Sequence, residues 1–310
     1  MKLLRGFQQL SNISAGTAVA IGNFDGVHLG HQALLRALRS QASHLQLPML
    51  VILFEPQPSE YFCGQQAPNR LSSLREKLKA LHSCGVEYVY CIKFDHRIAT
   101  MPAREFASHY IFSLLHAKFL LIGEDFRFGH DRVGDGSLLR ELGSQYSCIV
   151  QSFPDFAMDR HRVSSTKIRQ ALNVGEMDEA AKLLGRTYSM CGRVIHGAGL
   201  GRQWGIPTAN LNIRQSSLPL RGVFSVKVKR QGKPSSMGVA NIGCRPTIDG
   251  SRNSLEIHLF DVDESLYGEV LQVFFLQKLR DEKKFDSVDA LIAQIHKDVA
   301  LAKAYCAQIV

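Results

Sequence analysis

Two histidines lie three residues apart in a glycine-containing segment near the start of the chain. The segment reads Ile21-Gly-Asn-Phe-Asp-Gly-Val-His28-Leu-Gly-His31 and runs from an expected strand into an expected helix. Gly22 and Gly26 allow a tight turn, and Gly30 leaves space beside the first helical turn because glycine has no Cβ. Backbone amides and the helix dipole favour an anion there, and both imidazoles can face one phosphate chain. The segment predicts a nucleoside triphosphate site; histidines that only cap a helix are the alternative.

A second segment with anion-binding chemistry lies in the middle of the chain. It reads Val163-Ser-Ser-Thr-Lys-Ile-Arg169 and places three hydroxyls at an expected helix start, followed by Lys167 and Arg169. Hydroxyls at a helix start and nearby cations can together receive a phosphate. Taken alone, the segment fits an ordinary helix cap equally well.

A third segment, residues 197–210, combines four glycines with a threonine and an asparagine. It reads Gly-Ala-Gly-Leu-Gly-Arg-Gln-Trp-Gly-Ile-Pro-Thr-Ala-Asn. The glycine amides could surround phosphates, but the spacing is not that of a Walker loop. Thr208 offers a hydroxyl and Asn210 a carbonyl, which are oxygen ligands that Mg²⁺ accepts. From these residues alone, a β-turn segment is the alternative.

The elements that must position the first two segments follow an alternating pattern. From the start to about residue 186, short apolar runs alternate with segments of three- and four-residue apolar spacing. This order predicts an α/β domain with a doubly wound parallel sheet, covered by helices, that binds ligands at the carboxyl ends of its strands. We expect strands at residues 17–24, 49–54, 86–94, 118–122 and 148–153, and helices beginning near residues 29, 73, 102 and 137.

After Gly185 the chain changes to β-rich runs separated by glycine and proline. The change predicts an all-β domain, a small antiparallel barrel, followed by an amphipathic helix from residue 288 to about 306 with Leu291, Ile295 and Val299 on one face. We expect domains of residues 1–186 and 187–310. Short helices are expected at 166–172 and 177–184, and barrel strands at 190–195, 222–229, 236–242, 255–260 and 270–276.

Length and composition fit a folded protein with two domains. The chain has 310 residues, with 45% hydrophobic and 21% charged residues. An excess of 37 Lys and Arg over 28 Asp and Glu gives a formal charge of +9, which favours anionic partners such as nucleotides, nucleic acids or lipid surfaces. The basic residues are scattered, without the block that marks a nucleic-acid-binding tail.

Cysteine usage and hydropathy narrow the cellular setting. The seven cysteines include no C-x-x-C pair, so we expect reduced thiols in a cytoplasmic protein instead of disulfides or a zinc site. The N-terminus lacks a signal-peptide pattern, and no apolar run is long enough to span a bilayer. We expect no nucleic-acid, membrane or obligatory protein partner.

The first two segments together resemble the nucleotidyltransferase superfamily, through H-x-G-H and S-S-T-x-I-R. Two further strings, Phe54-Glu-Pro-Gln-Pro58 and Gly123-Glu-Asp-Phe-Arg-Phe-Gly129, resemble flavin-side loops of the FAD synthetase module of prokaryotic bifunctional riboflavin kinase/FAD synthetases. The resemblance implies that ATP phosphates are bound while the FMN phosphate attacks the α-phosphorus. It implies His28 and His31 as catalytic residues, and ligand contacts from Gly22, Phe24, Gly30, Phe54, Pro56, Asp125, Phe128, Ser164, Thr166 and Arg169. For the phenylalanines, core packing at strand ends is the alternative.

The third segment resembles the riboflavin kinase signature, G-x-x-x-G-R-x-x-G-x-P-T-A-N. Gly222-Val-Phe224, Asn241-Ile-Gly-Cys-Arg-Pro-Thr247 and Leu255-Glu-Ile-His-Leu-Phe-Asp261 follow in the family order. The resemblance implies Glu256 as the base for the ribityl hydroxyl, a role that a carboxylate can fill. A solvent-facing residue of an alternating strand is the alternative for Glu256. The resemblance also implies Thr208 and Asn210 as Mg²⁺ ligands, and phosphate contacts from Gly197, Gly201, Arg202 and Asn210.

Over nearly the whole chain, the resemblance implies a bifunctional enzyme with ATP as co-substrate and Mg²⁺ as cofactor in both reactions. Riboflavin would become FMN in the barrel, and FMN would become FAD in the N-terminal domain. We expect His258 to be a hydrogen-bonded structural residue, and Arg280 to begin either a loop over the flavin or a solvated turn. Two rival functions are adenylylation of phosphopantetheine or nicotinate mononucleotide, and regulation by binding flavin or nucleic acid without catalysis.

Overall fold

The computed structural model describes residues 1–6, 16–158, 161–197, 201, 204–213, 218–247 and 250–309. It divides into two compact units. The first contains Met1–Pro68 and Lys77–Ser164, and the second contains Asn69–Glu76 and Ser165–Val310. The domain boundary at residue 186 stays a prediction, and residues 165–185 pack with the second unit.

The first unit is built on a parallel sheet, as predicted. Its strand order is β1-β4-β3-β2-β5-β6, and every neighbouring pair is parallel. The central strands β2 and β3 are buried along nearly their whole length because helices cover both faces. The strands are β1 (Lys2–Leu4), β2 (Thr17–Ile21), β3 (Met49–Glu55), β4 (Tyr88–Lys93), β5 (Ala117–Gly123) and β6 (Ile149–Phe153). The edge strand β1 was not predicted.

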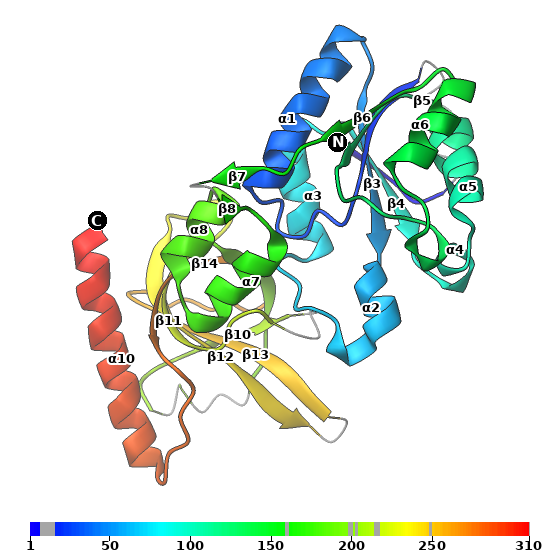
Figure 1. Cartoon of the computed structure of the whole chain (residues 1–310). Coiled ribbons are helices and arrows are strands. Elements are labelled where there is room, and N and C mark those ends of the chain that lie inside the picture. The colour runs from blue at the N-terminus through cyan, green and yellow to red at the C-terminus, as the bar shows by residue number, and fades with distance from the viewer. Residues whose placement is uncertain are drawn as a thin grey trace. The chain divides into compact units, whose positions relative to one another are not determined.

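Helices cover both faces of this sheet because the crossover connections run in opposite directions across it. Right-handed connections put α1 and α3 on one face and α5, η3 and α6 on the other (Figure 1). The direction changes between β2 and β5, where ligands of such sheets bind. The helices are α1 (Leu29–His44), α2 (Pro58–Cys63), α3 (Leu74–Ser83), α4 (His96–Ala99), α5 (Ala103–Phe106), the π-helix η3 (Ala107–Leu114) and α6 (Gly136–Gln145). Smaller elements are the 3₁₀ turns η2 (Gly64–Gln66) and η4 (His130–Arg132) and the paired strands β7 (Ala157–Met158) and β8 (His161–Arg162).

The second unit contains a closed antiparallel barrel, which confirms the predicted fold. The strand order around the barrel is β10-β13-β12-β11-β14-β9. Closure depends on β10, a four-residue strand that pairs with both β9 and β13. The strands are β9 (Ser189–Ile195), β10 (Ala209–Asn212), β11 (Gly222–Lys229), β12 (Ser236–Thr247), β13 (Gly250–Leu259) and β14 (Val270–Arg280). The predicted β-turn alternative for residues 197–210 is therefore wrong at its end, because Asn210 lies within a strand.

In the described part of the second unit, three helices accompany the barrel. They are α7 (Ser165–Val174), α8 (Met177–Leu184) and α10 (Val288–Ile309). Helix α10 packs on the barrel through Ala302 and Cys306, which join a buried cluster with Val223 and Val239. No helix in the described part of the chain combines the length and the apolar character needed to cross a membrane.

Candidate active sites

The first candidate site lies in the turn between β2 and α1. His28 is the N-cap of α1, and its Nδ1 accepts a hydrogen bond from the His31 backbone N–H at 3.3 Å. The two imidazole rings stack, with centroids 3.7 Å apart and planes 19° apart. At Gly30 a Cβ would lie 3.2 Å from the His28 ring, so glycine permits this stacking. The capping alternative is thus realised for His28, in a geometry that also pairs the two rings.

His31 is held in its neutral form by its surroundings. Burial is the main cause that lowers the pKa of His31 well below its ordinary value, and the nearby His28 and Lys77 lower it further. Its Nδ1 atom is buried and has no hydrogen-bond partner among the described residues. A buried polar atom without a partner is costly unless a ligand supplies one. His31 can therefore meet a ligand as a neutral hydrogen-bonding group.

Lys77 contributes to this site, although the sequence analysis did not single it out. Its side chain is 1% exposed, and its Nζ donates to the Asn23 carbonyl at 2.6 Å. The bond ties α3 to the turn that follows β2. Lys77 occupies the same face of α3 as the buried Leu81, and a lysine at such an apolar position was the available signal.

A cavity of about 550 Å³ lies beside the turn and collects residues from several strand ends. Of the predicted residues, Gly22, Phe54, Asp125 and Phe128 line it. The ring centroids of Phe126 and Phe128 are 5.6 Å apart, with the rings nearly parallel. Phe128 is also part of the buried core, so the ligand-lining and core alternatives both apply to it. The sequence analysis missed Phe62, Phe94, Phe106, Arg127 and Arg132, which line the same cavity.

Other predicted residues of this half lie outside the lining of that cavity. Phe24 is buried, with its ring centroid 5.0 Å from that of His31. Pro56 is exposed and follows a cis peptide bond. Ser164 is the last residue of the first unit, directly before α7.

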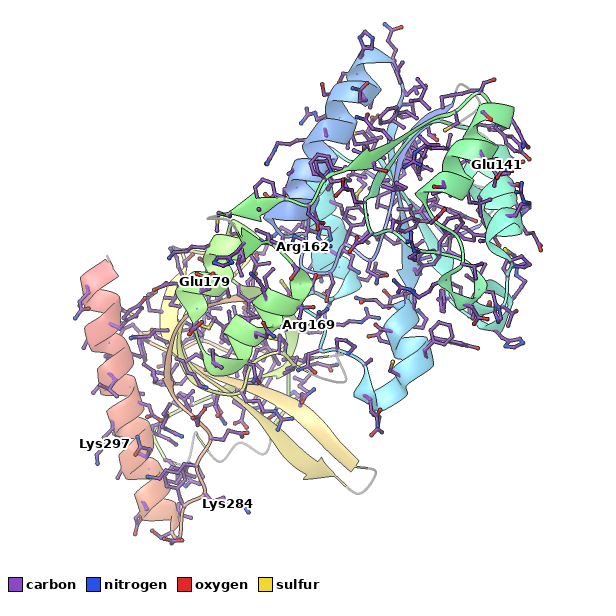
Figure 2. All side chains as sticks on the ribbon, viewed as in Figure 1. Glu141, Arg162, Arg169, Glu179, Lys284 and Lys297 are labelled. Carbon is purple, nitrogen blue, oxygen red and sulfur yellow. The ribbon has the colours of Figure 1, made fainter. Side chains whose placement is uncertain are left out.

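Thr166 and Arg169 belong to α7 in the second unit. Thr166 is exposed in the first turn of the helix. Arg169, labelled in Figure 2, donates from Nε to the Asn69 carbonyl at 2.6 Å. The predicted helix start at these hydroxyls is confirmed, and part of the Arg169 guanidinium holds the segment Asn69–Glu76.

The second candidate site lies on one face of the barrel wall, where three polar residues stand side by side. Glu256 on β13 is the direct partner of Asn210 on β10 and of Asn241 on β12. Side chains of directly paired residues point to the same face of a sheet, about 5 Å apart at Cβ. All three line a cavity of about 290 Å³, together with Thr208. The strand register therefore brings Glu256 and Asn210 together, and Thr208 lines the same cavity. Asn241 belongs to a motif named above but was not predicted to be a site residue.

Two glycines are required by the close packing of the predicted metal ligands. A Cβ at Gly197 would clash with the side-chain amide of Asn210. A Cβ at Gly201 would lie 3.2 Å from Thr208 Oγ1 and would clash with the Ile206 carbonyl. Both glycines thus leave room beside Thr208 and Asn210. Arg202 lies outside the described residues.

His258 is hydrogen-bonded, as expected. Its Nδ1 lies 2.9 Å from the Pro207 carbonyl oxygen, which can only accept, so Nδ1 carries the proton. The bond joins β13 to the residue before Thr208. His258 also lines the barrel cavity, two residues from Glu256 on the same face.

The other side of the barrel cavity is apolar and comes from α10. Leu291, Ile295 and Val299, predicted to share one helix face, line the cavity together with Trp204. Arg280 and Asp298 also line it. The sequence analysis assigned the helix face correctly but had no signal that the face borders a cavity.

Comparisons with known proteins match both halves of the chain. The FAD synthetase family model matches residues 10–167, and the Riboflavin kinase family model matches residues 184–306. Three relatives are named bifunctional riboflavin kinase/FMN adenylyltransferase. They come from Haemophilus influenzae (46% identical; 98% of this chain, 99% of the relative), Escherichia coli (46%; 98% and 98%) and Pseudomonas fluorescens (44%; 99% and 98%).

One solved structure is similar over nearly the whole chain. It comes from Streptococcus pneumoniae, is named a macrolide-efflux protein, and has a TM-score of 0.80 with 32% identity over 96% of both chains. The similarity extends to both halves of the fold. Its name denotes a different activity from the two matching family models, which agree with each other and with the three relatives.

The lowered pKa of His31 predicts a pH-dependent stability of the first unit. Below about pH 6.5, His31 is protonated in the unfolded chain but not in the folded chain. As the pH decreases from there, the free energy of unfolding therefore falls by up to about 1.4 kcal/mol per pH unit, until the lowered pKa of His31 is reached. His31→Asn should reduce this slope. Urea unfolding followed by far-UV circular dichroism between about pH 5 and pH 8 measures it.

Two controls separate this effect from others. His44→Asn, at the exposed far end of α1, should leave the slope unchanged. Trp204, the single tryptophan, reports unfolding of the barrel unit by fluorescence. Equal slopes in wild type and His31→Asn would contradict the prediction.

Proposed function

Because the chain belongs to the family of bifunctional riboflavin kinases/FMN adenylyltransferases, we propose that its two reactions take place in the two cavities described above. The enzyme phosphorylates riboflavin to FMN with ATP, and then adenylylates FMN with ATP to give FAD and pyrophosphate. The observation that carries the assignment of the kinase reaction is the paired row of Asn210, Glu256 and Asn241 in one cavity with Thr208.

In the kinase reaction, Glu256 acts as the general base. The 5′-hydroxyl of the ribityl chain gives its proton to the Glu256 carboxylate as its oxygen attacks the γ-phosphorus of ATP. The bond from the γ-phosphorus to the bridging oxygen breaks, and ADP leaves with that oxygen. A carboxylate suits this step because it can orient the alcohol and accept its proton as attack proceeds.

Thr208 and Asn210 would hold Mg²⁺ in the kinase site. Both offer hard oxygen atoms in the same cavity, and Gly197 and Gly201 keep the space beside them open. When bound, the ion supplies a positive charge that offsets the charge of the phosphates during transfer. Phosphate contacts from Gly197, Gly201 and Arg202 complete this proposal.

In the adenylyltransferase reaction, the FMN phosphate is already an anion and needs no base. One of its oxygens attacks the α-phosphorus of ATP, and the bond to the bridging oxygen breaks to release pyrophosphate. His28 and His31 contribute hydrogen bonds and orientation, with Gly30 permitting their stacked geometry. Contacts to ATP are proposed for Ser164, Thr166 and Arg169, and contacts to ligand for Phe24 and Pro56.

The aromatic cavity of the first unit would receive the flavin ring of FMN. Phe54, Phe126 and Phe128 offer flat apolar surface, and Gly22 and Asp125 line the same cavity. Mg²⁺ is proposed for this reaction too. The reactions are assigned to the cytoplasm because the seven cysteines of the sequence include no C-x-x-C pair and fit reduced thiols.

A regulator that binds nucleic acid without catalysis is the rival of a different class. Its only support is the formal charge of +9. Salt-sensitive RNA binding by a protein that does not convert riboflavin or FMN would favour it.

Incubation of the purified chain with riboflavin, ATP and Mg²⁺, followed by chromatography of the flavins, tests the proposed bifunctional activity directly. FMN should appear before FAD.

Glu256→Gln should reduce FMN formation by about 10²- to 10⁴-fold, because the amide cannot accept the hydroxyl proton. FMN adenylylation by the same protein should stay at the wild-type rate, which also reports correct folding of the first unit. Initial rates with riboflavin or FMN as the substrate give both values. Full kinase activity in Glu256→Gln would remove the carboxylate from the mechanism.

Thr208→Val should raise the Mg²⁺ concentration required for half-maximal kinase rate by about tenfold, because valine keeps the shape but removes the oxygen ligand. Titration of Mg²⁺ into the metal-free protein at fixed ATP measures this value. The Mg²⁺ dependence of FMN adenylylation should not change. An unaltered kinase titration would show that Thr208 does not hold the ion.

His258→Leu should lower the kinase kcat/KM by about tenfold, because loss of the bond to the Pro207 carbonyl frees the residue before Thr208. His258→Asn should retain most activity, since the Asn amide nitrogen can occupy the position of Nδ1. Steady-state kinetics of both variants provide the comparison. Equal loss in the two variants would show that the hydrogen bond is not what matters.

A further inference from the structure

An ion pair between a half-buried arginine and a buried aspartate connects the last barrel strand to the terminal helix. Arg280, at the end of β14, donates from Nε to both oxygens of Asp298 at 3.0 Å and from Nη2 to Oδ2 at 2.8 Å. Asp298 lies in the middle of α10 and is 2% exposed. Its neighbour Lys297 lies on the exposed side of the helix (Figure 2).

Further contacts fix the orientation of both partners. Arg280 Nη1 donates to the Asp281 carbonyl at 2.9 Å, and the guanidinium lies over the Phe285 ring at 5.7 Å. Gln294 Nε2 donates to Asp298 Oδ1 at 2.9 Å from the preceding turn of α10. The pair is thus a two-pronged, directional contact, which an arginine can make and a lysine cannot.

The ion pair borders the same cavity as the apolar face of α10. Arg280 and Asp298 line the barrel cavity beside Leu291, Ile295 and Val299. Apolar contacts alone do not fix the rotation or the axial position of a helix, because they are not directional. A bidentate ion pair does fix both.

Stability alone does not account for an ion pair that has one buried partner. Removing two charges from water costs about as much as their attraction returns, so apolar residues of similar volume often stabilise a protein equally well. What the pair adds is a defined position for the helix. In this chain the position decides how one wall of a substrate cavity is placed.

We propose that Arg280 and Asp298 form a positioning pair that holds α10 as the apolar wall of the barrel cavity and thereby sets the affinity for the flavin ring of riboflavin. The inference rests on the proposed kinase function of that cavity. The polar row around Glu256 faces the ribityl hydroxyl and the phosphates, whereas the helix wall offers the apolar surface that a flat tricyclic ring requires. Neither partner takes part in phosphoryl transfer.

Asp298→Asn keeps the shape of the side chain but removes its charge, and tests the proposal in the full-length chain. The KM for riboflavin should rise about tenfold, equivalent to about 1.4 kcal/mol. The kinase kcat and the KM for ATP should change by less than about twofold, because the loss concerns binding of riboflavin alone. The dissociation constant for riboflavin, measured from quenching of Trp204 in the cavity, should rise in parallel.

Arg280→Lys completes a double-mutant cycle. Lysine keeps the charge but loses the forked contact, so this variant should also raise the riboflavin KM. If the two residues act as a pair, the double variant should be no worse than the more affected single variant. Effects that simply add would overturn the pairing.

A second arginine–carboxylate pair in the same barrel provides the control. Arg230 makes a bidentate contact to Glu269, from Nε at 3.0 Å and Nη2 at 3.1 Å, and neither residue lines the cavity. Glu269→Gln should lower the melting temperature of the barrel while leaving the riboflavin KM unchanged. A rise in that KM equal to the rise in Asp298→Asn would show that general loosening of the barrel is responsible, and would overturn the proposal.

The remaining outcomes separate this inference from the proposed function. An unchanged riboflavin KM in Asp298→Asn, with FMN formation strongly reduced in Glu256→Gln, would overturn the positioning role alone. Full kinase activity in Glu256→Gln would instead remove the catalytic assignment of the cavity, and the positioning role with it. FMN adenylylation at the wild-type rate in every variant shows that the first unit is folded, and the native fluorescence of Trp204 shows the same for the barrel unit.

Discussion

The hydrogen-bonded register between neighbouring strands is the constraint on which both candidate sites depend. In the first unit, the parallel pairing of β2 with β5 brings the turn after Ile21 beside the loop after Gly123. In the barrel, the register of β13 against β10 and β12 aligns Glu256 with Asn210 and Asn241. A slip of one residue would turn the whole row to the opposite face. Backbone pairing therefore determines which functional side chains lie next to one another.

Glycines and charged side chains adjust the local geometry of the residues that the strand register brings together. Gly30 allows His28 and His31 to stack, and Gly197 allows the Asn210 amide to approach the backbone. Lys77 connects a helix to the turn that carries the histidines, as Arg280 connects a strand to α10. In each unit a cationic side chain holds an element beside a cavity through directional bonds. Such contacts limit the positions that otherwise non-directional apolar packing would allow.

The alternation of apolar runs with helical spacing was sufficient to predict the parallel sheet, the barrel and the terminal helix. It could not reveal β10, because Ala209–Asn212 has no strand-like pattern and is a strand through its pairing with two neighbours. Glu256, Thr208 and Asn210 were identified from motifs. Asn241 belongs to such a motif but was not predicted to be a site residue, and Asp298 belongs to none, since their proximity to the cavity arises from register and helix packing between distant segments. The sequence around each residue gives no indication of those long-range contacts.

The two reactions require opposite electrostatic surroundings, and the chain separates them accordingly. An alcohol must lose a proton as it attacks, so a carboxylate such as Glu256 helps the kinase reaction. A phosphate nucleophile is already charged, and a carboxylate directed at it would repel it. The first site instead offers imidazoles, with burial favouring the neutral form of His31. A neutral ring can donate to one phosphate and accept from another group without holding the product too strongly. A single cavity could not satisfy both demands, which gives a physical reason for two units with one intermediate between them.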